Sequence, residues 1–158
     1  DKSELIFAGF EKNPYYEKLE KLSEECLKDQ EKKKIVLNAH LKREEILDLY
    51  RTADVFVCSS KSETWSIVAH EAAAAAMPII STDVGVYGEI DGAFIVQNEE
   101  EMQEAMEKLY YSFEERKRRG EAAYRWLCTK GCRIEDKVDW LEKELLALRE
   151  RRKEVGEN

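Results

Sequence analysis

Short apolar runs alternate with amphipathic stretches along most of the chain. The runs are rich in Val, Ile, Leu and Phe and are short enough to be buried strands, over residues 4–9, 35–38, 54–58, 79–81 and 93–96. The intervening stretches have apolar positions three and four apart or good helix formers, which predicts helices over residues 13–30, 43–52, 66–76, 99–111, 114–128 and 134–149. The alternation predicts an α/β fold: a doubly wound, mostly parallel sheet with helices on both faces.

Two helix starts carry clear signals. Asn13-Pro14 places an N-cap residue before a proline at the first helical position. Asn98 precedes three consecutive glutamates, and acidic side chains in a first turn complement the helix dipole. These signals predict that the two helices begin at residues 14 and 99.

Length and charge narrow the class of protein. At 158 residues, the chain is predicted to hold one domain, over residues 1–150, followed by a charged tail at 151–158 that frays. The net charge of −8 argues against non-specific binding to nucleic acid or to an anionic membrane. Because no apolar run approaches 18 residues, we expect a cytoplasmic protein.

The four cysteines suggest no metal site. Cys26 and Cys58 are predicted to be packed thiols, on an apolar helix face and in a buried strand respectively. Cys128 and Cys132 are an isolated pair without a second pair or a nearby histidine, which is weak support for zinc.

The most informative stretch runs from Ser59 to Glu71. An apolar strand ends at Cys58, a polar loop follows, and a helix opens near Ser66, whose hydroxyl is available as an N-cap. A helix start at the carboxyl end of a parallel strand is where α/β proteins hold phosphate. Glu71 lies roughly 7.5 Å along the helix axis from Ser66.

Glu63 and Glu71 therefore flank the predicted phosphate position, where they could accept hydrogen bonds from the hydroxyl groups of a nucleotide sugar. The alternative is that both are solvated glutamates, because 38% of the chain is charged.

Several motifs that follow one another along the chain support the predicted nucleotide-sugar site. They are Leu49-Tyr50 with Ala53–Ser59, the pair Glu63-x7-Glu71, Met77-Pro78-Ile79-Ile80, Thr82–Gly85 and Glu89-Ile90. Together they resemble the donor-binding C-terminal domain of retaining GT-B glycosyltransferases, the glycogen-synthase and sucrose-synthase-like group. The resemblance covers about residues 4–148. It implies a Rossmann-like domain that lacks its first strand in this chain and a longer enzyme with a separate N-terminal acceptor domain.

The resemblance also implies residue roles. Glu71 would bind the ribose hydroxyls, and Glu63, the candidate catalytic residue, would bind hydroxyls of the donor sugar; neither is expected to be a nucleophile. Donor binding is assigned further to the loop and helix start and to a histidine at the rim near the base: Thr64, Trp65, Ser66, Ile67 and His40.

The loop departs from the family's usual Glu-Gly-Phe-Gly. Thr64 and Ser66 replace glycines and offer hydroxyls that can donate to phosphate. Trp65 is expected to pack beneath the loop rather than to stack on a sugar. His70 is not expected to be catalytic, because successive helix residues point about 100° apart and it cannot share the direction of Glu71.

The predicted activity is transfer of a sugar from a nucleoside-diphosphate sugar, with retention, to a carbohydrate or lipid-linked acceptor bound by the missing N-terminal domain. The resemblance implies no cofactor and no metal, and no nucleic-acid partner is expected. It leaves open peripheral association of the full enzyme with the inner face of a membrane.

Two other functions stay open. One is a non-catalytic nucleotide-sugar-binding or assembly domain. The other is a flavodoxin-like signalling domain phosphorylated at a strand-end aspartate. The second is disfavoured because the first two predicted strands end in Gly9 and Asn38 rather than in acidic residues.

Overall fold

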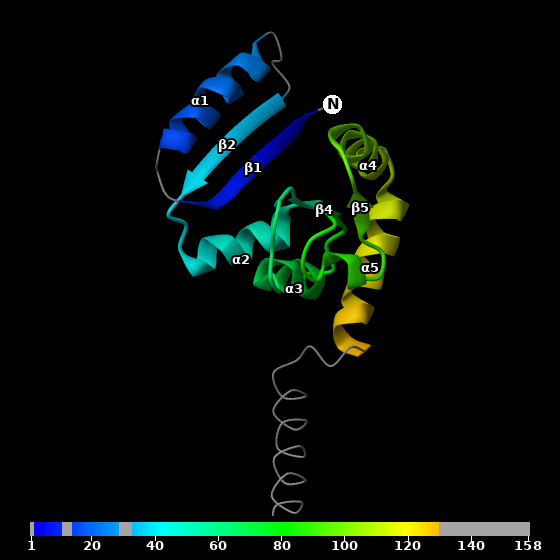
Figure 1. Cartoon of the computed structure of the whole chain (residues 1–158). Helices are drawn as coiled ribbons and strands as arrows, with labels where there is room; N and C mark the ends of the chain where they lie inside the picture. Colours follow the sequence, from blue (N-terminus) through cyan, green and yellow to red (C-terminus); the bar gives the residue numbers. More distant parts are fainter. Residues whose placement is uncertain (1, 11–13, 29–32, 130–158) are drawn as a thin grey trace, which may run out of the picture. The chain divides into compact units, whose positions relative to one another are not determined.

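A computed structural model gives the structure of the chain and describes residues 2–10, 14–28 and 33–129. Several predicted features lie outside these ranges: Asn13, Cys132, the helix over 134–149 and the tail at 151–158. The chain divides into two compact units, and the boundary falls between Thr52 and Ala53. Figure 1 shows both units and labels most of their elements.

The first unit is a pair of parallel strands with two helices. Strands β1 (Ser3–Phe10) and β2 (Lys33–Ala39) pair in a register that sets Leu5 opposite Ile35. Helix α1 (Pro14–Leu27) begins at the predicted proline, and helix α2 (Arg43–Thr52) has the predicted bounds. Tyr16 holds α1 to the sheet: it is buried, and its hydroxyl donates a hydrogen bond to the carbonyl of Leu37, 3.2 Å away.

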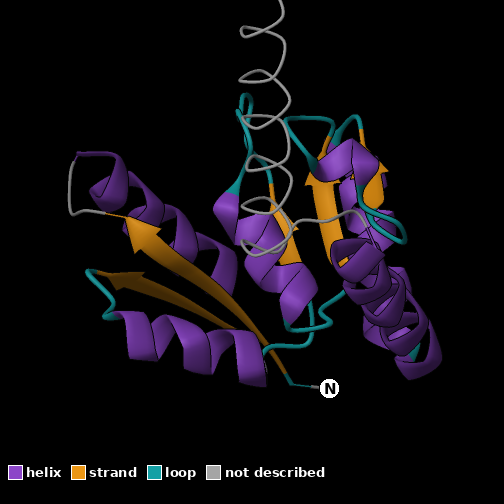
Figure 2. Cartoon of the chain, turned by 90° about the horizontal axis from the view of Figure 1, so that it is seen from below, coloured by secondary structure: helices purple, strands orange, loops and turns teal. Residues whose placement is uncertain are grey.

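The second unit is built on three parallel strands in the order β3-β4-β5: Phe56–Cys58, Ile79–Thr82 and Phe94–Val96. Its helices are α3 (Ile67–Ala74), α4 (Glu99–Tyr111) and α5 (Phe113–Thr129), with a 3-10 turn, η1, at Tyr87–Glu89. Figure 2 shows helices flanking these strands.

The core of the second unit lies on its central strand. Ile79 and Ile80 of β4 are fully buried, and Ile80 packs in one cluster with Val96 and with Ala105 and Leu109 of α4. An apolar side chain buried in this way contributes about 1.5–3 kcal/mol to stability. This strand is more deeply buried than β3, whose residues are only half-buried.

Two local features concern helices α4 and α5: a side-chain cap at the start of α4 and a glycine where α5 packs closely. Asn98 caps α4 as predicted, because its side-chain oxygen accepts a hydrogen bond from the Glu101 amide at 2.9 Å. Helix α5 crosses the turn between α3 and β4 at Gly120, where a Cβ atom would collide with the carbonyl of Ala76. The missing side chain lets α5 approach α3 closely, which brings Trp126 of α5 into the buried interior.

The predicted α/β class with parallel strands is confirmed, but the described strands form two sheets rather than one. Within each sheet the strands lie in their order along the chain, β1-β2 in the first unit and β3-β4-β5 in the second. The described helices include none that could cross a membrane.

The prediction that Cys26 packs into the interior was wrong, because its side chain is exposed. The apolar side of α1 covers a sheet of only two described strands, so much of that side stays open to solvent, and Leu22 is also 52% exposed.

Candidate functional site

The candidate site is the loop between β3 and α3 in the second unit. It starts after Cys58 and ends at Ser66, whose backbone has φ 59° and ψ 89°, in the left-handed region that favours glycine. Helix α3 then begins at Ile67. The chain therefore passes from the carboxyl end of a parallel strand to a helix start, as the sequence predicts.

Ser66 lies at the N-cap position, but the prediction that its hydroxyl caps the helix was wrong. The Ser66 Oγ instead shares a hydrogen bond with the hydroxyl of Tyr87, with 2.9 Å between the two oxygens. The left-handed backbone turns the side chain inward, and Ser66 is 8% exposed. The hydroxyl is thus turned away from solvent, and the first amides of α3 receive no cap from it.

Tyr87, from the 3-10 turn η1, anchors Ser66 from within the core. Its side chain is fully buried and its ring stacks on Phe56 of β3, with 6.5 Å between the ring centres. Burial raises the pKa of Tyr87, and the neighbouring Cys58 thiol raises it further. The phenol therefore stays neutral and keeps its hydrogen bond at ordinary pH.

Glu63 is held within the loop by hydroxyl groups. The Ser60 hydroxyl donates to its carboxylate at 3.2 Å, and the Cys58 thiol donates to the same hydroxyl oxygen at 3.5 Å. Ser60 is itself fixed, because the Thr82 hydroxyl at the end of β4 donates to its carbonyl at 2.6 Å. The half-buried Glu63 carboxylate is thereby tied to the ends of two neighbouring strands.

Gly85 supports the same glutamate from the next loop. Its φ is +53°, and a Cβ atom added there would lie 3.0 Å from the Cβ of Glu63 and 3.3 Å from the carbonyls of Glu63 and Thr64. Both the backbone conformation and the close approach require glycine at this position. The loop after β4 therefore packs directly against the loop that carries Glu63.

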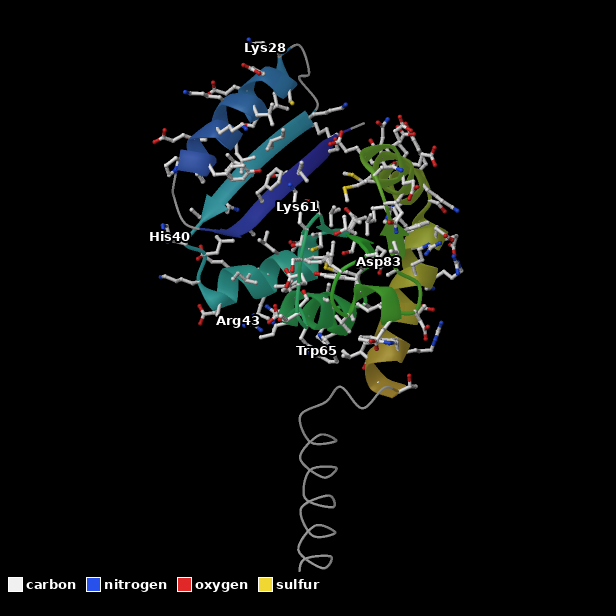
Figure 3. The ribbon with its side chains drawn as sticks, in the orientation of Figure 1. Lys28, His40, Arg43, Lys61, Trp65 and Asp83 are labelled. Atoms are coloured by element: carbon white, nitrogen blue, oxygen red, sulfur yellow. The ribbon has the colours of Figure 1, made fainter. Side chains whose placement is uncertain are left out.

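Trp65 lies at the surface beside α3 (Figure 3). One face of its indole stacks on the imidazole of His70, with 5.1 Å between the ring centres, while 51% of the residue is exposed. The prediction that Trp65 packs beneath the loop is therefore wrong for about half of the residue, which is exposed to solvent, while one face of the indole is covered by His70. Its neighbours Thr64 and Ile67 are exposed, and Ile67 is 73% exposed.

The last two predicted residues lie in different units. Glu71 is half-buried on α3, five residues beyond Ser66, so it belongs to the same loop and helix as Glu63, Thr64 and Trp65. His40 follows β2 in the first unit, where it is exposed and has φ 59°. The predicted site residues of the second unit therefore all lie on one loop and the helix that follows it, and His40 lies in the first unit.

Sequence reasoning missed three residues that shape the site: Tyr87, Ser60 and Trp126. Tyr87 is 21 residues from Ser66, and Trp126 packs against His70 from another helix, so no local pattern announces either contact. The described residues contain no cluster of three or more side chains suited to a metal ion.

Residues 1–126, most of the chain, match the family described as Glycosyl transferases group 1. The chain belongs to this family. It therefore carries a glycosyl transferase domain, which decides against the flavodoxin-like signalling alternative.

Solved structures agree with this assignment. The C-terminal domain of a glycosyl transferase group 1 family protein (LpcC) from Francisella tularensis is 25% identical, with a TM-score of 0.64, and the match covers 75% of this chain and 65% of that one. Sucrose-phosphate synthase from Thermosynechococcus elongatus is 19% identical, with a TM-score of 0.68 over 92% of this chain, and shares the fold.

The chain spans 65% and 38% of the lengths of these two proteins. No curated protein sequence matches it significantly.

Proposed function

We propose that this chain is the donor-binding domain of a glycosyltransferase that uses a nucleoside-diphosphate sugar and retains the anomeric configuration. The diphosphate would lie against the amides that begin α3. Glu71 would accept hydrogen bonds from the ribose hydroxyls, and Glu63 from hydroxyls of the donor sugar. The acceptor would be bound by a further domain of the whole enzyme.

The observation that carries the proposal is the inward turn of the Ser66 hydroxyl toward Tyr87. A helix start gathers amide N–H groups and a partial positive charge, and a serine at the N-cap normally occupies one of those amides. Here the hydroxyl is bonded elsewhere, so the start of α3 is left without a side-chain cap from Ser66. Such a helix start, at the carboxyl end of a strand, suits an anionic diphosphate.

The Ser66 hydroxyl itself has a structural role in this proposal, because it is buried against Tyr87. Ser66 would thus serve donor binding through its backbone. The exposed hydroxyl of Thr64 is the side-chain group better placed to reach a phosphate oxygen.

The chemistry follows from where charge develops. As the bond between the sugar and the diphosphate breaks, negative charge grows on the departing diphosphate and positive charge on the sugar ring. Amide dipoles that are already in place stabilise the departing group without reorganising, which is the largest contribution in many enzymes. The bonds from Ser60 and Thr82 keep the loop of Glu63 in one conformation while this occurs.

The test is calorimetry of the full-length protein with UDP-, GDP- and ADP-sugars, with turnover measured in parallel. We expect one class of nucleotide sugar to bind and to be turned over. A change of Glu71→Gln should weaken that binding about 10- to 100-fold, because a hydrogen bond to a charged group contributes about 1.5–3 kcal/mol.

Glu104→Gln, an exposed glutamate on α4, is the matched control and should leave binding unchanged. Binding without turnover would favour a non-catalytic nucleotide-sugar-binding domain. Equal losses from Glu71→Gln and Glu104→Gln, or no binding of any of the sugars, would contradict the proposal.

A further inference from the structure

His70 joins the candidate loop to helix α5. Its imidazole lies between two indoles: it stacks on Trp65 with 5.1 Å between ring centres and an angle of 27°, and it meets Trp126 at 5.6 Å and 49°. Trp126 is 1% exposed, so one side of this stack is buried in the second unit and the other side, at Trp65, reaches solvent.

The same imidazole holds the backbone of the loop. Its Nδ1 lies 3.0 Å from the carbonyl oxygen of Ser66. A carbonyl oxygen can only accept, so Nδ1 must carry the proton and donate. The buried Nε2 has no hydrogen-bond partner within the described part of the chain, so Ser66 is the polar contact of this side chain there.

These contacts restrain the two residues immediately before α3. The stack restrains the side chain of Trp65, and the hydrogen bond restrains the peptide that follows Ser66, whose left-handed backbone is intrinsically unfavourable. A leucine at position 70 could pack between the indoles but could not donate to the carbonyl. A histidine supplies both restraints from one side chain.

We propose that His70 is a positioning residue for donor binding, acting through Trp65 and Ser66 rather than touching the donor. This rests on the function proposed above. By fixing the peptide between Ser66 and Ile67, His70 fixes the direction of the first amide of α3. The folded protein then already holds the loop in one conformation, so less conformational entropy is lost when the donor binds.

Two variants separate the two restraints. His70→Phe keeps a ring between the indoles and removes the donor, while His70→Asn keeps an N–H donor and removes the ring. Each should weaken binding of the nucleotide sugar about three- to fivefold, and His70→Leu, which loses the donor and the aromatic ring, about tenfold or more. The probes are UDP-glucose, GDP-mannose and ADP-glucose, titrated calorimetrically into the full-length protein.

Leu109→Ala is the control for a general loss of stability. Leu109 is fully buried on α4, and it lies in the core cluster with Ile80 and Val96. This variant should lower the midpoint of thermal unfolding while leaving donor affinity unchanged at a temperature where the protein is folded. If it weakens donor binding as much as His70→Leu does, or if His70→Leu binds like the wild type, the positioning role is wrong.

A second readout does not depend on the donor. In protein labelled with 5-fluorotryptophan, the ¹⁹F resonance of Trp65, assigned from Trp65→Phe, should shift in His70→Leu and His70→Asn and stay in place in Leu109→Ala. If the wild type binds none of the three sugars, the proposed function fails, and this resonance still reports whether the side chain at position 70 packs against Trp65. An unmoved Trp65 resonance in His70→Leu would overturn the inference.

Discussion

Ser66 offers a sharp test of how the candidate loop is held, because two opposing effects meet at one residue. Its left-handed backbone is unfavourable for any residue with a Cβ atom, while its buried hydroxyl shares a hydrogen bond with Tyr87. Ser66→Ala removes the bond and keeps the unfavourable backbone. Ser66→Gly removes the same bond and also relieves the backbone.

The magnitudes follow from these contacts. Loss of the hydrogen bond costs about 1 kcal/mol, and a residue other than glycine in the left-handed region costs about 1–2 kcal/mol. We therefore expect Ser66→Ala to lower the free energy of unfolding by about 1–2 kcal/mol. Ser66→Gly should remain within about 0.5 kcal/mol of the wild type, because the two changes nearly offset each other.

Urea unfolding followed by circular dichroism measures both values, and Tyr87→Phe completes a double-mutant cycle with Ser66→Ala. Because the two side chains are direct partners, the cycle should give a coupling of about 1 kcal/mol. A Ser66→Gly protein as unstable as Ser66→Ala, or a coupling near zero, would refute the description of Ser66 as a strained residue held by Tyr87.

Three further predictions concern other residues of the second unit. Gly85→Ala should lower the free energy of unfolding by about 1–2 kcal/mol in urea titrations and weaken donor binding, because it displaces Glu63. Gly88→Ala is the control and should cost less, because Gly88 has no positive φ and its new Cβ would meet only a side-chain oxygen. The pKa of Tyr87 is raised in the folded state, so folded Tyr87 keeps its proton at pH values above 10.0, where the unfolded chain loses it. The free energy of unfolding should therefore fall as pH rises past about 10, by at most ~1.4 kcal/mol per pH unit. Tyr87→Phe should flatten this slope in urea titrations, and an unchanged slope would contradict the buried phenol. Hydrogen bonds from two arginines lower the pKa of Glu115 from 4.5 to about 2. The stability that Glu115 contributes is therefore present above pH 4.5 and lost as pH falls toward 2. Glu115→Gln should remove that loss in acid unfolding curves, and a curve unchanged from the wild type would contradict this role of Glu115.

The order of strands and helices could be predicted because apolar runs and apolar positions three and four apart are patterns of residues close together in sequence. The helix at residues 43–52, the Asn98 cap and the strand–loop–helix at Ser66 are all set by residues close together in sequence. These local patterns and the family motifs place Glu63 and Glu71 on one loop and helix.

What could not be predicted depends on contacts between distant residues. Whether the Ser66 hydroxyl caps α3 or turns inward is decided by Tyr87, and whether Trp65 is covered is decided by His70 and Trp126. The separation of the strands into two sheets likewise depends on which strands pair, and an apolar run alone does not encode its partner.

The most direct test of the central claim is a titration of ¹⁵N-labelled full-length protein with the nucleoside diphosphate of the donor that binds in calorimetry. We expect the amide resonance of Ile67, at the first position of α3, to move among the most in the second unit and to saturate with the calorimetric affinity. Saturating binding that leaves Ile67 unmoved and shifts amides elsewhere would contradict a diphosphate site at the start of α3.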